Sequence, residues 1–241
     1  MTNIEIIKKL KESTFTDEDG EKYQLEFQDG LTDSEIEQLK KQFPSNNIDS
    51  EIIEILKETR GWDGYGLEMV YFDSIGQFGF WELSANAITL GHDGFGNHWI
   101  LDLDKNGKAN KVFFACHDPA VFVLHSQNLN EYLNHLLEFY ENPDKCHLSE
   151  IHDKTVMKIW NENELCSAKT EFDNQNPEFK GFLNKFDGDK WTVADLRTGK
   201  NKDGFAWGKF GSNQFTERHP TELVWVIKNK KKGLFSRLFG K

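Results

Sequence analysis

Two His-Asp pairs are the residues of this chain whose types could support metal-dependent hydrolysis. They are His92-Asp93 and His117-Asp118, and phosphohydrolase centres use such pairs to hold metal ions. A centre of this kind needs further His and Asp ligands on helices, whereas these pairs would have to act from strand ends. Three other histidines stand without the spacing of an H-E-x-x-H motif, namely His98, His125 and His135. The sequence therefore predicts no metal site, and a metal-dependent hydrolase is the lesser alternative.

A second possible cation site is the segment Asp102–Gly107. Its residues match D-x-[DN]-x-[DN]-G, the first half of a calcium-binding loop. The twelfth position of such a loop is a bidentate Glu, and here it is Phe113. Because the flanking segments are strand-like rather than helical, a tight hairpin turn is the better interpretation.

Nucleophilic catalysis and phosphate binding have no motif in this sequence. Cys116 precedes His117, but successive side chains of a strand point to opposite faces, so the two cannot act as a nucleophile and its base. The glycines between Gly91 and Trp99 form neither G-x-G-x-x-G nor a P-loop, and a strand follows them where a helix would be needed. We therefore assign no catalytic residue and no cofactor, and we expect a protein that is not an enzyme.

Length and composition exclude several classes of protein. The chain has 241 residues, 37% of them hydrophobic, which is enough to bury the core of one or two domains. Twenty Phe and seven Trp exclude a disordered chain, and no apolar run approaches the ~20 residues that span a bilayer. The N-terminus has no secretory signal, and the cysteines form no C-x-x-C pair: Cys116, Cys146 and Cys166. We therefore expect a cytoplasmic protein without a disulfide framework.

The charge is distributed unevenly along the chain. Residues 1–150 hold 28 Asp and Glu and 12 Lys and Arg, a net charge of -16, whereas residues 151–241 hold 12 and 17, a net charge of +5. This asymmetry suggests two modules, of which the acidic one would repel nucleic acid and attract a basic partner. The alternative is that the carboxylates only keep the protein soluble.

The elements that must position these residues follow from hydrophobic spacing. An opening segment of about ten residues has helical spacing, and in residues 31–43 Thr32 and Glu35 are set for a capping box. Further helices are expected over 51–59 and 129–140. Between them, short aromatic and β-branched runs separated by Gly, Asn and Asp predict strands. Helices, then a mostly antiparallel sheet, then a packing helix make an α+β fold.

Four segments are predicted along the chain. Residues 1–30 form an N-terminal helix and hairpin extension, and residues 31–145 form the α+β domain. Residues 146–227 alternate like strands and form a small β-rich module, which we interpret as a barrel of four or five strands. Residues 228–241 form a basic amphipathic tail.

The order of these elements resembles the SUKH superfamily, the Smi/Knr-type group, over about Leu31 to Tyr140. The resemblance is carried by a G-x-D-G-x-G-N-x-(aromatic) turn that leads into L-D-L, and by the His-Asp pair before the last strand. The matching residues are Trp62, Gly91, Asp93, Gly94, Gly96, Asn97, Trp99, Asp102, His117 and Asp118. We interpret these residues as structural, because turn geometry alone would require them. The first 30 residues and residues 146–241 have no counterpart in this pattern.

The resemblance implies a non-catalytic domain that presents a partner-binding face. Bacterial members of the superfamily neutralise a cognate polymorphic toxin, often a nuclease or deaminase, and fungal members regulate cell-wall synthesis. We therefore expect an immunity protein that binds a basic toxin domain, with a regulatory adaptor as the alternative. Four carboxylates that flank the aromatic strands are expected to contribute to binding: Asp63, Glu68, Asp73 and Glu82.

The tail Lys228–Lys241 carries a net charge of +6 beside four apolar residues. Basic residues next to an apolar stripe are attracted to an anionic membrane surface. A helix of this length is marginal in water, so docking on the acidic module or a solubilising terminus is the preferred interpretation.

Overall fold

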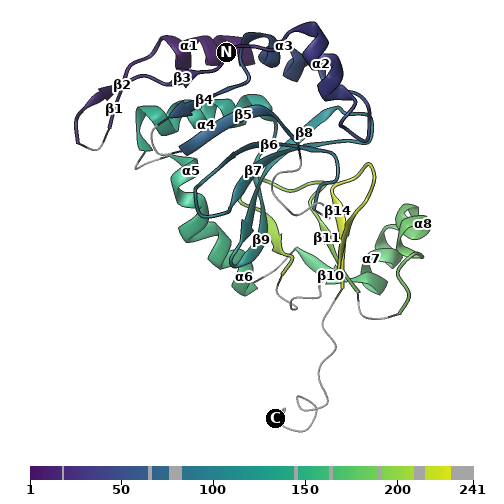
Figure 1. The fold of residues 1–241 in the computed structure, drawn as a ribbon. Coiled ribbons are helices and arrows are strands. Elements are labelled where there is room, and N and C mark those ends of the chain that lie inside the picture. The colour runs from purple at the N-terminus through teal and green to yellow at the C-terminus, as the bar shows by residue number, and fades with distance from the viewer. Residues whose placement is uncertain are drawn as a thin grey trace.

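An eight-stranded antiparallel sheet organises the molecule. The computed structural model describes residues 1–17, 19–64, 67–75, 83–143, 146–162, 165–188, 191–208 and 215–228 (Figure 1). The strand order of the large sheet is β12-β9-β8-β7-β6-β5-β4-β3, so the strands from β4 to β9 follow one another as a meander. A second, four-stranded sheet has the order β10-β11-β14-β13.

The strands of the large sheet are β3 Glu26–Phe27, β4 Gly61–Gly64, β5 Leu67–Ile75, β6 Ala87–His92, β7 His98–Leu103, β8 Ala109–His117, β9 Ala120–Ser126 and β12 Gly204–Ala206. The second sheet consists of β10 Cys166–Ala168, β11 Trp191–Asp195, β13 Thr216–Arg218 and β14 Val224–Lys228. A small hairpin pairs β1 Phe15–Thr16 with β2 Lys22–Tyr23.

The helices of the first part are α1 Asn3–Glu12, α2 Asp33–Lys40, α3 Ser50–Glu58 and α4 Leu129–Glu141. Those that follow are α5 His147–Glu150, η2 Ile151–Val156, α6 Met157–Glu162, α7 Lys169–Gln175, η3 Pro177–Phe179 and α8 Lys180–Leu183.

Local capping signals fix where the first helices begin. The Thr32 hydroxyl accepts a hydrogen bond from the Glu35 backbone N–H, and the Glu35 carboxylate accepts one from the Thr32 backbone N–H at 2.8 Å. The predicted capping box is therefore confirmed. Helix α4 begins in a similar way, because the Asn128 side chain accepts from the backbone N–H of Glu131.

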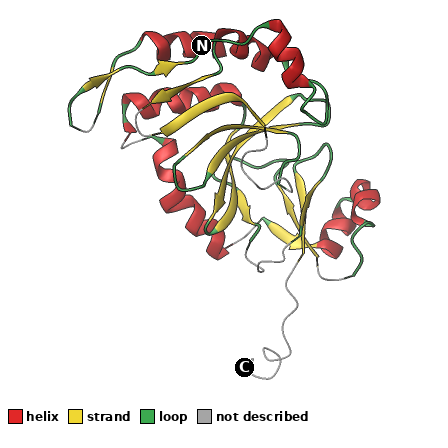
Figure 2. Cartoon of the chain, viewed as in Figure 1, coloured by secondary structure: helices red, strands yellow, loops and turns green. Residues whose placement is uncertain are grey.

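Alternation along the central strands separates two cores. On β8, Val112, Phe114 and Cys116 face the core beneath the helices, whereas Phe113 and Ala115 face the second sheet. Figure 2 shows the result: helices cover one side of the large sheet and the four-stranded sheet lies on its other side. The strands are buried on both faces, which explains their continuous hydrophobic runs.

The C-terminal part differs from the predicted barrel. Its four strands form an open sheet, and a third core of aromatic and aliphatic residues packs helices α7 and α8 against it. Strand β12 joins the large sheet, since Gly204 pairs with Val123 and Ala206 with Val121 of β9. The α+β fold class is confirmed. The division at residue 145 stays a prediction, and the pairing of β12 with β9 shows that the segments on either side of it share a sheet.

The predicted tail lies outside the described residues except for Lys228, the last residue of β14. Across the described ranges, no helix has the length and apolar character needed to cross a bilayer.

Candidate functional site

The turn between β6 and β7 is built around the carboxylate of Asp93. Asp93 Oδ1 accepts hydrogen bonds from the backbone N–H groups of Phe95 at 2.9 Å and Asn97 at 3.1 Å. Its Oδ2 accepts a third bond from Asn97 Nδ2 at 2.7 Å. The side chain thus holds the backbone of the turn as an Asx-type cap, which fixes the conformation of the residues it encloses.

Two glycines of the motif occupy positions that need them. Gly94 and Gly96 have φ angles of +74° and +86°, in the left-handed region that L-residues with a side chain avoid. A Cβ atom on Gly96 would also lie 3.1 Å from the His117 ring. This geometry gives both glycines a conformational role in the turn, and the structural interpretation of the motif residues stays a prediction.

His117 connects this turn to the hairpin of β8 and β9. The Asn97 Oδ1 atom accepts a hydrogen bond from the His117 backbone N–H at 3.1 Å and lies 3.0 Å from His117 Nδ1. The structure therefore brings together Asp93, Gly94, Gly96, Asn97 and His117, which we call the turn network.

Phe95 stands at the tip of the turn network and points into solvent. Its side chain is 82% exposed, the highest value among the large hydrophobic residues that the structure describes. Its backbone N–H is held by Asp93, so the exposed ring is carried on a fixed backbone. Phe95 could not be singled out from the sequence, because a phenylalanine in an aromatic-rich chain gives no signal of its exposure.

The remaining motif residues lie away from the tip. Trp62 is fully buried and its indole N–H donates to the Tyr140 hydroxyl at 3.1 Å, which ties β4 to α4. Trp99 and Gly91 are buried in the sheet, and Asp118 is exposed at the β8–β9 turn. These positions do not form one site with the turn network.

Asp102 belongs to a buried ion pair that joins the two sheets. Arg218 Nη2 of β13 lies 2.6 Å from Asp102 Oδ2, although the residues are 116 positions apart, and both side chains are almost fully buried. Ser84 donates to the same carboxylate at 2.5 Å and Asn110 at 3.2 Å. Burial raises the pKa of Asp102, and the Arg218 charge opposes that effect.

The segment after Asp102 forms a hairpin turn rather than a calcium loop. Asp104 Oδ1 accepts from the backbone N–H groups of Asn106 at 2.7 Å and Lys108 at 3.0 Å, and Gly107 has a φ of +78°. The Asp102 carboxylate, which would be the first ligand of a calcium loop, is paired with Arg218 instead. The turn interpretation fits both observations.

Cys116 has the properties of a structural thiol. Its side chain faces the buried core, whereas the neighbouring His117 is exposed. Burial raises the pKa of the Cys116 thiol to about 11, so little thiolate forms near neutral pH.

Of the four predicted partner-binding carboxylates, two are described. Asp63 is half-buried on β4, and its Oδ1 atom is buried without a hydrogen-bond partner among the described residues. Asp73 on β5 pairs with Arg60 at 2.8 Å. The side chain of Glu68 and the whole of Glu82 lie outside the described residues. Their role in binding stays a prediction.

One comparison with known proteins gives a match. Residues 30–135 match the model of the SMI1 / KNR4 family (SUKH-1). No curated protein and no solved structure matches the chain. The matched range includes the whole turn network and Phe95, and it ends within α4, before the second sheet begins.

Proposed function

Through residues 30–135 the chain belongs to the SUKH superfamily, and on this basis we propose that it is an immunity protein, which neutralises a cognate bacterial toxin by binding it. The toxin would be a nuclease or deaminase, and the binding protein itself would carry out no reaction. The family match is the observation that carries this proposal. We place the encounter in the cytoplasm, and it needs neither a cofactor nor nucleic acid.

Phe95 is the residue that we propose as the anchor of the interface. Exposed aromatic side chains contribute a large share of the affinity when a partner encloses them. Because the turn network already holds the backbone of Phe95, little backbone conformational entropy is lost when the ring is bound. Both features support a contact made by the β6–β7 turn.

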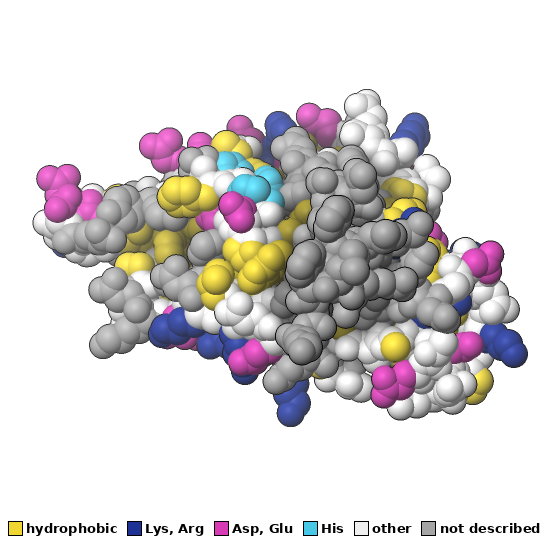
Figure 3. Space-filling view, turned by 90° about the horizontal axis from the view of Figure 1, so that it is seen from below, with side chains coloured by type: hydrophobic (Ala, Val, Ile, Leu, Met, Phe, Trp, Pro, Cys, Tyr) yellow, Lys and Arg dark blue, Asp and Glu magenta, His cyan; other side chains and the backbone are white. Residues whose placement is uncertain are grey.

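Net charge supports a basic partner. Residues 1–150 carry a net charge of -16, whereas enzymes that act on nucleic acid present positive surfaces to the phosphates. Figure 3 shows acidic and basic side chains on the same face, so the described part of that face is not uniformly negative. We therefore propose that the negative charge speeds association with the toxin, whereas the apolar contact of Phe95 provides most of the affinity.

The four carboxylates named above are proposed contributors of unequal weight. Asp73 is already paired with Arg60, so its replacement should change association less than replacement of Asp63.

Neutralisation in living cells tests this function. The toxin candidate is the open reading frame beside the gene for this chain, expressed from an inducible promoter in a host that lacks the chain. Co-expression of the full chain should restore growth, and the two proteins should co-elute at a 1:1 ratio. Growth that remains arrested, with both proteins soluble, would contradict the proposal.

A regulatory adaptor is the second candidate, favoured by the part of the structure outside the matched range. The second sheet has its own core with α7 and α8, and this adds a surface that the family match does not account for. An adaptor should form complexes with host proteins and have no toxin gene beside it. For the tail Lys228–Lys241, membrane contact stays a weaker proposal than the two alternatives together, docking on the acidic module and a solubilising terminus.

A further inference from the structure

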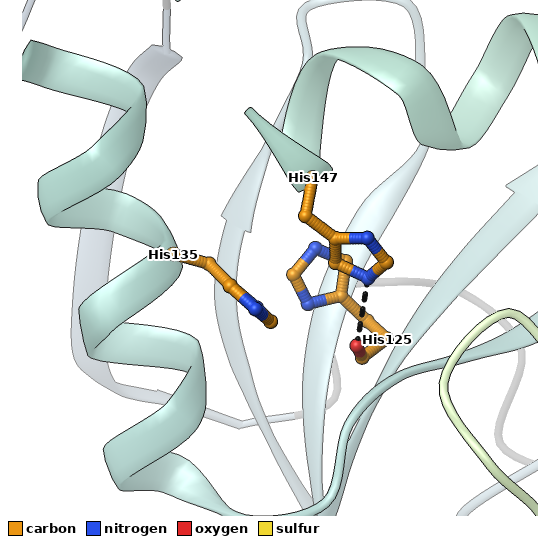
Figure 4. Close-up of side chains that lie close together, drawn as sticks. All are labelled: His125, His135 and His147. Atoms are coloured by element: carbon orange, nitrogen blue, oxygen red, sulfur yellow. Dashed lines mark hydrogen bonds between the residues drawn. The ribbon is translucent and has the colours of Figure 1, made fainter. Parts of the chain in front are cut away.

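Three histidines from three consecutive elements lie close together on the side of the large sheet that the helices cover. His125 is on β9, His135 is on α4 and His147 begins α5 (Figure 4). One ring nitrogen of each lies within 4.8 Å of those of the other two. The ring centroid of His147 lies 4.6 Å from that of His125 and 4.6 Å from that of His135. In the sequence His125 and His135 stand as isolated histidines without a ligand spacing, and nothing there singles out His147.

Hydrogen bonds hold one nitrogen of each ring. His125 Nδ1 lies 2.8 Å from the Ser126 hydroxyl, which lies 3.0 Å from His135 Nδ1. His147 Nε2 lies 3.0 Å from the backbone carbonyl oxygen of His125, to which it can only donate. This bond fixes the tautomer of His147 with its lone pair on Nδ1. If both Nδ1–H groups donate to the Ser126 oxygen, His125 and His135 carry their lone pairs on Nε2.

Such bonds are the usual support of metal-binding histidines. A ligating imidazole commonly donates its second N–H to a carbonyl, carboxylate or hydroxyl oxygen, which orients the ring and makes the other nitrogen a better ligand. The His125 carbonyl takes this position for His147. The Ser126 hydroxyl, within hydrogen-bond distance of both His125 Nδ1 and His135 Nδ1, is placed to do so for the other two rings.

The buried nitrogen of His125 gives an independent observation. His125 is fully buried, and its Nε2 atom has no hydrogen-bond partner among the described residues. An unpartnered polar atom at such a position is unfavourable, and a bound ion would satisfy it. Burial lowers the pKa of all three histidines, which keeps the rings neutral and able to bind a cation.

We propose that His125, His135 and His147 bind one divalent transition-metal ion, for which zinc is the best fit. Three imidazoles with a fourth position left to water form a common zinc site, whereas calcium and magnesium require oxygen ligands. Tetrahedral zinc places its nitrogens ~3.4 Å apart, closer than the 4.8 Å limit within which the three ring nitrogens lie here, so the rings must move together when the ion binds.

The site would connect β9, α4 and α5. His147 lies beyond the residues matched to the family, so the metal site is a property of this chain and does not depend on the proposed immunity function. It also revises the sequence-based prediction that the chain holds no metal.

Zinc titration of the full, untagged chain tests the proposal. After chelator treatment and dialysis, calorimetry should show one zinc ion per chain, and cobalt should give the absorption bands of a tetrahedral complex. His135→Gln and His147→Gln are the informative variants, because these side chains are half-buried and their replacement is tolerated better than that of His125. Each should weaken zinc binding at least 100-fold and abolish the rise in melting temperature that zinc gives the unaltered chain.

His98→Gln is the matched control, since His98 is also half-buried but lies outside the cluster. It should bind zinc as the unaltered chain does. Circular dichroism confirms that each variant is folded. Absence of stoichiometric binding by the folded, unaltered chain would overturn the proposal, and so would equal affinity in the two cluster variants and the control.

Discussion

Replacing Asp93 with alanine removes the acceptor that holds the β6–β7 turn. Three hydrogen bonds are lost, from Phe95 N at 2.9 Å, Asn97 N at 3.1 Å and Asn97 Nδ2 at 2.7 Å. Each such bond contributes about 1 kcal/mol net, and water replaces part of the loss because Asp93 is only half-buried. We therefore expect the free energy of unfolding to fall by about 2–3 kcal/mol. Urea unfolding followed by tryptophan fluorescence measures this change.

Asp104→Ala is a matched control for this prediction. Its carboxylate holds a similar turn with two backbone bonds, at 2.7 and 3.0 Å, so the expected loss is smaller, about 1–2 kcal/mol. The double variant Asp93→Ala, Asn97→Ala should lose less stability than the sum of the single variants, because the two residues share the 2.7 Å bond. A loss below about 0.5 kcal/mol for Asp93→Ala, within the range of ordinary surface changes, would refute the reasoning.

Three further predictions concern buried or half-buried groups. Arg218→Met leaves Asp102 without its cation and should lower the free energy of unfolding by about 3–5 kcal/mol in urea; a change below about 1 kcal/mol would contradict this. Burial and the His92 charge lower the pKa of His98, so the unfolded chain binds a proton first as the pH falls. Stability should therefore decrease from about pH 7 to 5, and His98→Gln should make that decrease smaller. With its pKa raised to about 11, Cys116 should react with iodoacetamide only after denaturation, and mass spectrometry would detect any earlier modification.

Features that depend on neighbouring residues could be predicted from the sequence. The capping box of Thr32 and Glu35, the helical stripe of α4 and the turn at Gly107 each result from residues a few positions apart. The positive φ angles of Gly94 and Gly96 in the β6–β7 turn are also set locally, by residues within that turn.

Features that depend on distant residues could not be predicted. Arg218 meets Asp102 across 116 positions, and β12 pairs with β9 from beyond the expected boundary. The histidine cluster forms only when α4 and α5 pack against β9, so no residue spacing in the sequence predicts it. Helices α7 and α8 are too short to be stable alone, and the aromatic core that they share with the second sheet stabilises them.

The affinity of the chain for the purified product of the gene beside its own, which the proposed function takes as the toxin candidate, tests the central claim most directly. Surface plasmon resonance should give a 1:1 complex that Phe95→Ala weakens at least tenfold, mainly through faster dissociation. Met157 is another exposed hydrophobic residue and lies on α6, so Met157→Ala should leave the affinity unchanged. A toxin domain that does not bind the folded chain, or that binds the Phe95→Ala variant as tightly as the unaltered protein, would contradict an interface centred on the β6–β7 turn.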